Sequence, residues 1–128
     1  MRLLLDTCTF LWIGLNSEKL SKAAVAAFLH PENQRFLSAA SAWEIANKYS
    51  AGRLPLPRDP EYFIGEGREK SGIATLPLDE ESALLTSRLP RLHGDPFDRM
   101  LVAQAMIHDL IIVTPDEDIA RYGVRVLW

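Results

Sequence analysis

Short apolar runs alternate along this chain with longer segments in which apolar residues recur every three or four positions. Runs of the first kind are typical of buried strands, and segments of the second kind are typical of helices that cover a sheet. Such alternation predicts βα units and a parallel sheet. We therefore expect a three-layer α/β/α sandwich with a mainly parallel sheet of about five strands and residues 110–113 at its centre. The predicted strands are about 2–5, 34–38, 73–78, 110–113 and 124–127.

Capping residues mark where the predicted helices begin. Asp95 followed by Pro96 predicts a helix start, because proline fits the first helical turn and the aspartate oxygen accepts from its free N–H groups. Gly65 and Gly67 weaken the helix predicted for residues 59–71, since glycine costs about 1 kcal/mol relative to alanine in a helix interior. The other predicted helices are 9–15, the segment after Ser21, the segment ending near Ser50 and the segment after Asp79.

The length and composition indicate one ordinary domain, 1–128, with a proper core, since 48% of the residues are hydrophobic. Cys8 is the single cysteine, so no intramolecular disulfide can form. We see no secretory leader and no apolar stretch near the roughly 20 residues that a membrane-spanning helix needs. We therefore expect a cytoplasmic protein with no membrane contact. Trp12 and Trp43 are expected in the core or at a contact between copies.

Four acids stand where a parallel α/β fold would bring them together. Asp6 and Asp116 follow apolar runs of strand length, and Glu44 and Asp98 lie near the start of helical segments. The carboxyl ends of parallel strands and the amino ends of the next helices share one edge of the sheet, where open α/β folds place their sites. Carboxylates gathered there repel one another unless a cation is present, and a hard divalent ion is the usual one. The sequence therefore predicts a metal site.

Each acid also has a purely structural interpretation. Glu44 fits a capping box that begins at Ser41, and Asp95 is a natural N-cap. Asp98 could serve the helix dipole in the first turn of the same helix. If the acids only cap helices, the chain is a non-catalytic α/β binding module without metal affinity.

Metal-assisted phosphodiester hydrolysis is the chemistry that fits the acids best, because it needs no side-chain nucleophile. The net charge of −3 argues against a general nucleic-acid coat, yet single cations such as Lys48, Arg53 and Arg99 can still hold phosphate. The three histidines lack metal-ligand spacing, which makes a zinc site improbable. One of them, His93, is expected on a loop surface.

Two other Mg²⁺-dependent classes fit less well. A phospho-acceptor domain needs an adjacent acid pair after the first strand and a lysine after the fifth, and a phosphatase of the haloacid-dehalogenase type needs Asp-x-Asp. The chain reads Asp6-Thr7-Cys8 at the first of these positions. We keep both as alternatives to a nuclease.

The chain resembles the PIN-domain family, and within it the VapC-type toxin ribonucleases of type II toxin–antitoxin systems. The resemblance runs from residue 1 to 128, and its motifs are highly specific when taken together. In family order they are LLLDTCTFLW, SAASAWEIANK, GRL, HGDPFDRMLVAQA, IVTPD and YGVRVLW.

This resemblance implies a PIN fold and a Mg²⁺- or Mn²⁺-dependent endoribonuclease that leaves a 5′-phosphate and a 3′-hydroxyl. It also implies a homodimer that a small antitoxin protein silences at the acidic site. The family's catalytic acids fall on Asp6, Glu44, Asp98 and Asp116, with Asp6, Asp98 and Asp116 as metal ligands. Thr7, Thr114 and Asp95 fall on supporting positions.

Three positions depart from close relatives. Cys8 stands where many carry histidine, and Gly94 and Pro115 stand where a basic residue is common. We expect these departures to affect the grip on RNA or the sequence preference and to spare the metal acids. The RNA target itself stays open.

Overall fold

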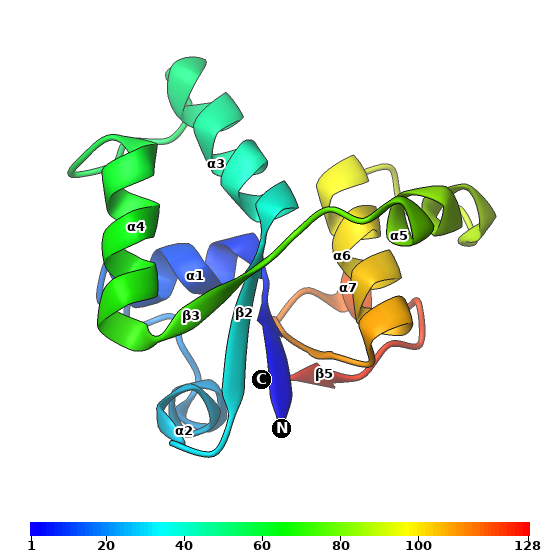
Figure 1. The fold of residues 1–128 in the computed structure, drawn as a ribbon, viewed down its shortest axis with the longest axis horizontal. Coiled ribbons are helices and arrows are strands. Elements are labelled where there is room, and N and C mark those ends of the chain that lie inside the picture. The colour runs from blue at the N-terminus through cyan, green and yellow to red at the C-terminus, as the bar shows by residue number, and fades with distance from the viewer.

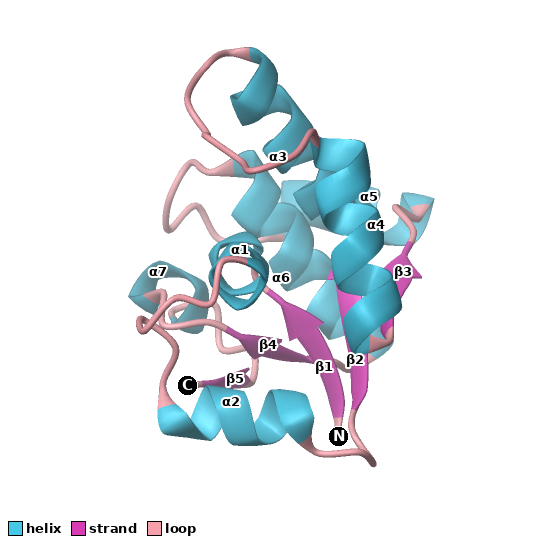
Figure 2. Cartoon of the chain, turned by 90° about the vertical axis from the view of Figure 1, so that its left-hand side faces the viewer, coloured by secondary structure: helices cyan, strands magenta, loops and turns pink.

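The computed structural model describes residues 1–128, which form a parallel sheet of five strands between two layers of helices (Figure 1, Figure 2). The strand order is β3-β2-β1-β4-β5, and all four pairings are parallel. This confirms the predicted fold class, but β1 and not the run at 110–113 occupies the centre. The strands are β1 (Arg2–Leu5), β2 (Gln34–Ser38), β3 (Ile73–Leu76), β4 (Ile111–Val113) and β5 (Val126–Leu127).

Side-chain oxygens cap the amino ends of all seven α-helices, including the predicted caps Ser21, Asp79 and Asp95. The helix α7 (Glu117–Ala120) was not predicted, because its four residues are too few to show a helical period. None of the helices has the length and apolar composition needed to cross a bilayer. The helices are α1 (Thr7–Gly14), α2 (Lys22–Leu29), α3 (Ala39–Ser50), α4 (Pro60–Ser71), α5 (Glu80–Leu85), α6 (Pro96–His108) and α7 (Glu117–Ala120), with a 3₁₀ turn at Thr86–Arg88.

The three leucines of β1 explain why this strand lies in the middle. Leu3 and Leu5 pack into a core with α1, α2 and α4, and Leu4 packs on the opposite face with α6 and α7. All three leucines are fully buried. A strand buried on both faces reads as a continuous apolar run, as parallel sheets require.

The pairing of β1 with β4 determines where the candidate site lies. Leu5 lies opposite Val113, so the residues that follow, Asp6 and Thr114, leave the sheet side by side. The helix α1 begins directly after Asp6, two residues earlier than predicted, because Asp6 itself is the N-cap. The chain therefore turns from strand to helix at the point where the first acid stands.

The two predicted core or contact tryptophans have different surroundings. Trp12 is half-buried and packs edge-on against Trp128 at a centroid distance of 5.7 Å. Trp43 is 61% exposed, so a place in the core is wrong for this residue.

Gly65 and Gly67 are both inside α4, and we expect opposite effects when each is replaced by alanine. A Cβ at Gly67 would lie 2.9 Å from Cζ of the buried Phe10, whereas nothing lies within 4 Å of a Cβ at Gly65. Gly65→Ala should stabilise the fold by up to about 1 kcal/mol through helix propensity. Gly67→Ala should destabilise it by about 1–3 kcal/mol, because the Phe10 ring must move in a packed core. Urea unfolding measures whether each variant is more or less stable than the wild type. A Gly67→Ala variant that is more stable would contradict the close approach of Phe10 to Gly67.

Candidate active site

A cavity of about 360 Å³ lies where β1 and β4 end, and acids dominate its wall. It is lined from α1, from α3, from the start of α6 and from the turn after β4. The structure thus gathers all four acids that the sequence predicted to meet. The charged residues that line it are Asp6, Glu44, Asp95, Asp98 and Asp116, with Lys48 and Arg53 as the cations.

Asp6 is buried at the bottom of this arrangement, with 4% of its surface exposed. Its Oδ1 accepts from the backbone N–H of Thr7 at 2.7 Å, and its Oδ2 accepts from Thr114 Oγ1 at 2.7 Å and from Cys8 Sγ at 3.3 Å. Burial raises the pKa of Asp6, the charge of Glu44 adds to the rise, and the three hydrogen bonds oppose it. Asp6 is therefore a rigid carboxylate in a site that disfavours its charge.

Cys8 supports this carboxylate. Burial and the charge of Asp6 raise the pKa of the Cys8 thiol to about 12, so at neutral pH it keeps its proton and donates it. This position thus holds a weak neutral donor beside the first acid.

Thr114 connects Asp6 to Asp116. Its Oγ1 donates to Asp6 and accepts from the backbone N–H of Asp116 at 3.0 Å. Asp116 in turn caps α7 by accepting from the backbone N–H of Asp118 at 2.8 Å. A single hydroxyl therefore fixes the relative positions of the two strand-end acids.

Asp95 and Asp98 stand at the amino end of α6. Asp95 is the N-cap, because its Oδ1 accepts from the N–H groups of Phe97 and Asp98 at 2.9 and 3.0 Å. Burial raises the pKa of Asp98 to about 7, and repulsion from Asp95, Asp6 and Asp116 adds to the rise. Asp98 does not cap the helix, so capping gives no reason for its burial.

Glu44 faces the cavity from α3. The alternative role of Glu44, a capping box with Ser41, does not match the structure, because α3 begins at Ala39 and its N-cap is Ser38. The buried Glu44 carboxylate instead accepts from Lys48 Nζ at 2.6 Å, and this bond is the main reason that the pKa of Lys48 is raised.

Thr7, one of the predicted supporting residues, joins two of the elements that carry acids. Its Oγ1 donates to Ser41 Oγ at 2.9 Å, and both side chains are buried. This bond holds the start of α1, next to Asp6, against α3, which carries Glu44.

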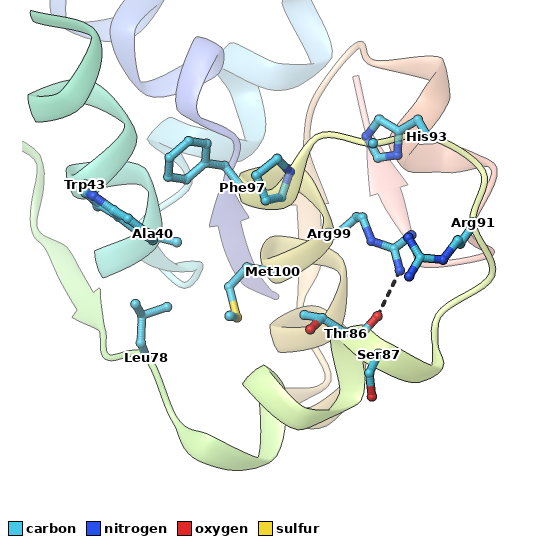
Figure 3. Close-up of a pocket in the computed structure, with 12 residues that line it drawn as sticks. Ala40, Trp43, Leu78, Thr86, Ser87, Arg91, His93, Phe97, Arg99 and Met100 are labelled. Carbon is cyan, nitrogen blue, oxygen red and sulfur yellow. Dashed lines mark hydrogen bonds between the residues drawn. The ribbon is translucent and has the colours of Figure 1, made fainter.

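A second cavity of about 440 Å³ lies on the other side of the amino end of α6 (Figure 3). Trp43 and Phe97 meet edge-on at its rim with ring centroids 5.2 Å apart, and Leu78 and Met100 line it from opposite sides. Arg99 also lines this second cavity and not the acidic one.

A model of the PIN domain matches residues 3–125 of the chain. The chain belongs to the PIN-domain family. Chains of similar fold occur in solved structures that include the following three. VapBC2 from Rickettsia felis, bound to a promoter DNA fragment, is 12% identical with a TM-score of 0.73, and the match covers 98% of this chain and 97% of that chain. VapBC-1 from nontypeable Haemophilus influenzae is 12% identical with a TM-score of 0.67, and the match covers 98% of this chain and 96% of that chain. FitAcB from Neisseria gonorrhoeae is 21% identical with a TM-score of 0.61, and the match covers 97% of this chain and 95% of that chain. No curated protein matches the chain.

PIN-domain nucleases generally use divalent metal ions. In this PIN domain no group of three or more acid, histidine or cysteine side chains is arranged to hold an ion. Glu44 pairs with Lys48, and one oxygen of Asp98 pairs with His93. The donors nevertheless fit a hard cation, because carboxylate oxygens line the cavity, and burial together with repulsion from the other acids raises the pKa of Asp98. The second oxygen of Asp98 carries no hydrogen bond and can accept a ligand.

The structure changes the interpretation of His93 and Arg99. His93 is not a surface residue, since only 14% of its side chain is exposed and its Nε2 lies 3.1 Å from Asp98 Oδ2. Arg99 donates to the carbonyls of Thr86 and Pro90 at 2.8 and 2.9 Å, so this PIN domain uses it to hold its own backbone. The one sequence signal for His93 was its position five residues before Asp98.

Proposed function

We propose that residues 1–128 form a single metal-dependent endoribonuclease domain and act as the toxin of a type II toxin–antitoxin pair. The observation that carries the proposal is the cavity lined by five acids at the carboxyl ends of β1 and β4. Like charges gathered in one cavity cost free energy, and a divalent cation is what would relieve it. The PIN fold and the toxin–antitoxin structures that share it support the same conclusion.

The acids have distinct proposed roles. Asp6, Asp98 and Asp116 would hold Mg²⁺ or Mn²⁺, and Thr114 keeps the two strand-end acids in place for it. Glu44 closes the cluster from α3. The ion, when bound, supplies the positive charge that polarises the phosphate and lowers the pKa of the attacking water. Cleavage of RNA would leave a 5′-phosphate and a 3′-hydroxyl.

Lys48 and Arg53 are the proposed contacts to the RNA backbone, because they are the cations that line the acidic cavity. Lys48 is 42% exposed at its side chain although it pairs with Glu44, so it can exchange this carboxylate for a phosphate. Arg99 is not among these contacts, since its guanidinium makes four hydrogen bonds within the protein.

A non-catalytic binding module is the second candidate, and one observation favours it. Asp6, Asp95 and Asp116 do cap helices, as that interpretation requires. It does not account for Glu44 and Asp98, which are inside their helices and still line the same cavity, with 7% and 15% of their side chains exposed.

The acidic cavity would also be the binding site of an antitoxin partner. The similar structures are toxin–antitoxin complexes, and we propose that a small antitoxin protein binds this chain too. A partner that places a basic side chain among the acids would be attracted and would block the site. RNA and antitoxin would then compete for one cavity.

A homodimer is proposed through the surface around Trp43, where Leu78 is also exposed, at 43%. An exposed tryptophan beside apolar neighbours is typical of a contact between proteins. Trp43→Asp should give a monomer, while Leu29→Asp, at a leucine on α2 that is 67% exposed, should leave the dimer intact. Light scattering after size exclusion measures both masses. A monomeric wild-type protein at micromolar concentration would rule the dimer out.

The decisive test is cleavage of total cellular RNA by the antitoxin-free protein with Mg²⁺ or Mn²⁺ and with a chelator control. Asp6→Asn should be inactive, whereas Asp118→Asn, a half-exposed acid on α7 that does not line the cavity, should cleave normally. Discrete fragments that need both metal and Asp6 support the endoribonuclease. Intact RNA together with no thermal shift on adding Mn²⁺ would support the binding module.

A further inference from the structure

His93 lies in the loop before α6 (Figure 3). Both nitrogens of its ring have partners. Nε2 lies 3.1 Å from Asp98 Oδ2, and Nδ1 lies 2.7 Å from the hydroxyl of Tyr122. The rings of His93 and Tyr122 are also in contact, with centroids 5.4 Å apart. The imidazole is thus held between Asp98 and Tyr122.

Arg99 gives this chain of hydrogen bonds a direction. Its Nη1 lies 3.0 Å from the Tyr122 hydroxyl, and arginine has donors only, so the phenol oxygen accepts. The phenol proton is then free for Nδ1 of His93. A neutral imidazole that accepts at Nδ1 carries its proton on Nε2, and this N–H donates to the carboxylate of Asp98.

The Arg99 guanidinium, which donates the first of these hydrogen bonds, is itself fixed. Besides the phenol, it donates to the carbonyl oxygens of Thr86, Pro90 and Leu89 at 2.8, 2.9 and 3.4 Å. Tyr122 is buried, with 8% of its surface exposed. Neither group can turn away without breaking several bonds, so the orientation of His93 is set before any ligand binds.

We propose that His93 is a positioning residue for Asp98, oriented through Tyr122 and Arg99, so that Oδ2 is held and Oδ1 faces the cavity for a cation. The proposal rests on the proposed function, because it concerns the same acidic site. A donor that fixes one oxygen of a ligating carboxylate is worth about 10- to 100-fold in metal affinity. The sequence gives no sign that Tyr122 takes part, since it is 29 residues away from His93.

The helix α6, which carries Asp98, offers a matched control for the His93 variants. His108, at the other end of α6, pairs with Asp79 at 2.9 Å, so it also forms a histidine–aspartate pair. Neither residue lines the acidic cavity. Loss of His108 should therefore affect packing between α6 and α5 without affecting the site.

The experiment measures Mn²⁺ affinity by electron paramagnetic resonance on the full chain, without RNA. We expect His93→Ala to weaken Mn²⁺ binding at least tenfold, His93→Gln to restore part of it through its amide N–H, and His108→Ala to leave it unchanged. Circular dichroism checks that each variant is folded. Nitrogen-15 spectra of the imidazole at alkaline pH should show the Nε2–H tautomer in the wild type and a mixture in Tyr122→Phe, which removes only the hydroxyl.

The outcomes separate the proposal from the proposed function. Wild-type affinity in a folded His93→Ala, or an Nδ1–H tautomer in the wild-type protein, would overturn the positioning role and leave the nuclease proposal standing. If the wild-type protein binds no Mn²⁺, the metal site fails and the positioning role fails with it. Equal losses in His93→Ala and His108→Ala would also overturn it, because the effect would then be general to α6.

Discussion

Asp98→Asn is expected to abolish metal-dependent RNA cleavage and at the same time to stabilise the metal-free protein. A metal ligand contributes several kcal/mol to the transition state, which corresponds to a loss of about 100- to 1000-fold in rate. The gain in stability follows from the pKa of about 7, raised by burial and by the neighbouring acids. Each pKa unit represents about 1.4 kcal/mol, and after relaxation we expect a gain of about 1–3 kcal/mol at pH 8.

The sign of the pH dependence follows from proton linkage. Between about pH 4, where an unfolded aspartate ionises, and pH 7, the folded state holds the Asp98 proton longer than the unfolded state does. The contribution of Asp98 to stability therefore falls as the pH rises through this window and stays low above it. The gain in Asp98→Asn should accordingly be large at pH 8 and small at pH 4.

Urea unfolding in a chelating buffer at the two pH values measures this gain, and Asp118→Asn is the control. Asp118 pairs weakly with Arg121 at 3.5 Å on an exposed surface, so its loss should change stability by less than about 0.5 kcal/mol at either pH. An Asp98→Asn variant that is less stable than the wild type at pH 8, or that cleaves RNA at the wild-type rate, would contradict the assignment of Asp98.

Phe10→Ala is expected to cost about 3–5 kcal/mol of stability, a large part of what a domain of this size has. Phe10 is 1% exposed and meets the ring of Phe63 edge-on at a centroid distance of 5.9 Å, so it joins α1 to α4. Its loss leaves a cavity directly behind the helix that Asp6 caps. We therefore expect both a lower melting temperature and lower activity.

Trp43→Ala is the comparison that tests this interpretation. Trp43 is larger than Phe10 but 61% exposed, so its truncation should cost the monomer less than about 1 kcal/mol. Thermal melts at a concentration where both variants are monomeric separate the two effects. If Trp43→Ala were the more destabilising substitution, the exposure of Trp43 and the core role of Phe10 would both be wrong.

Helix starts and strand ends were largely predictable, because the signals are local. Asp79 and Asp95 cap the helices that were predicted to follow them, and the strand at Gln34–Ser38 has the predicted bounds. The capping box considered as the alternative role of Glu44 does not match the structure, because the N-cap of α3 is Ser38, three residues before Ser41. A short sequence motif fits several registers of one helix, and only the packing of α3 selects among them.

The sequence by itself determined the alternation of strands and helices, since each period depends on residues close in the chain, and it placed acids at the ends of two strands. Only the tertiary structure decided which donor each carboxylate meets. Asp6 binds Thr114 across 108 positions, and His93 meets Tyr122 across 29. It also decided that β1 is central and that Trp43 is exposed. Contacts between such distant residues arise from the pairing of whole elements, which no local pattern encodes.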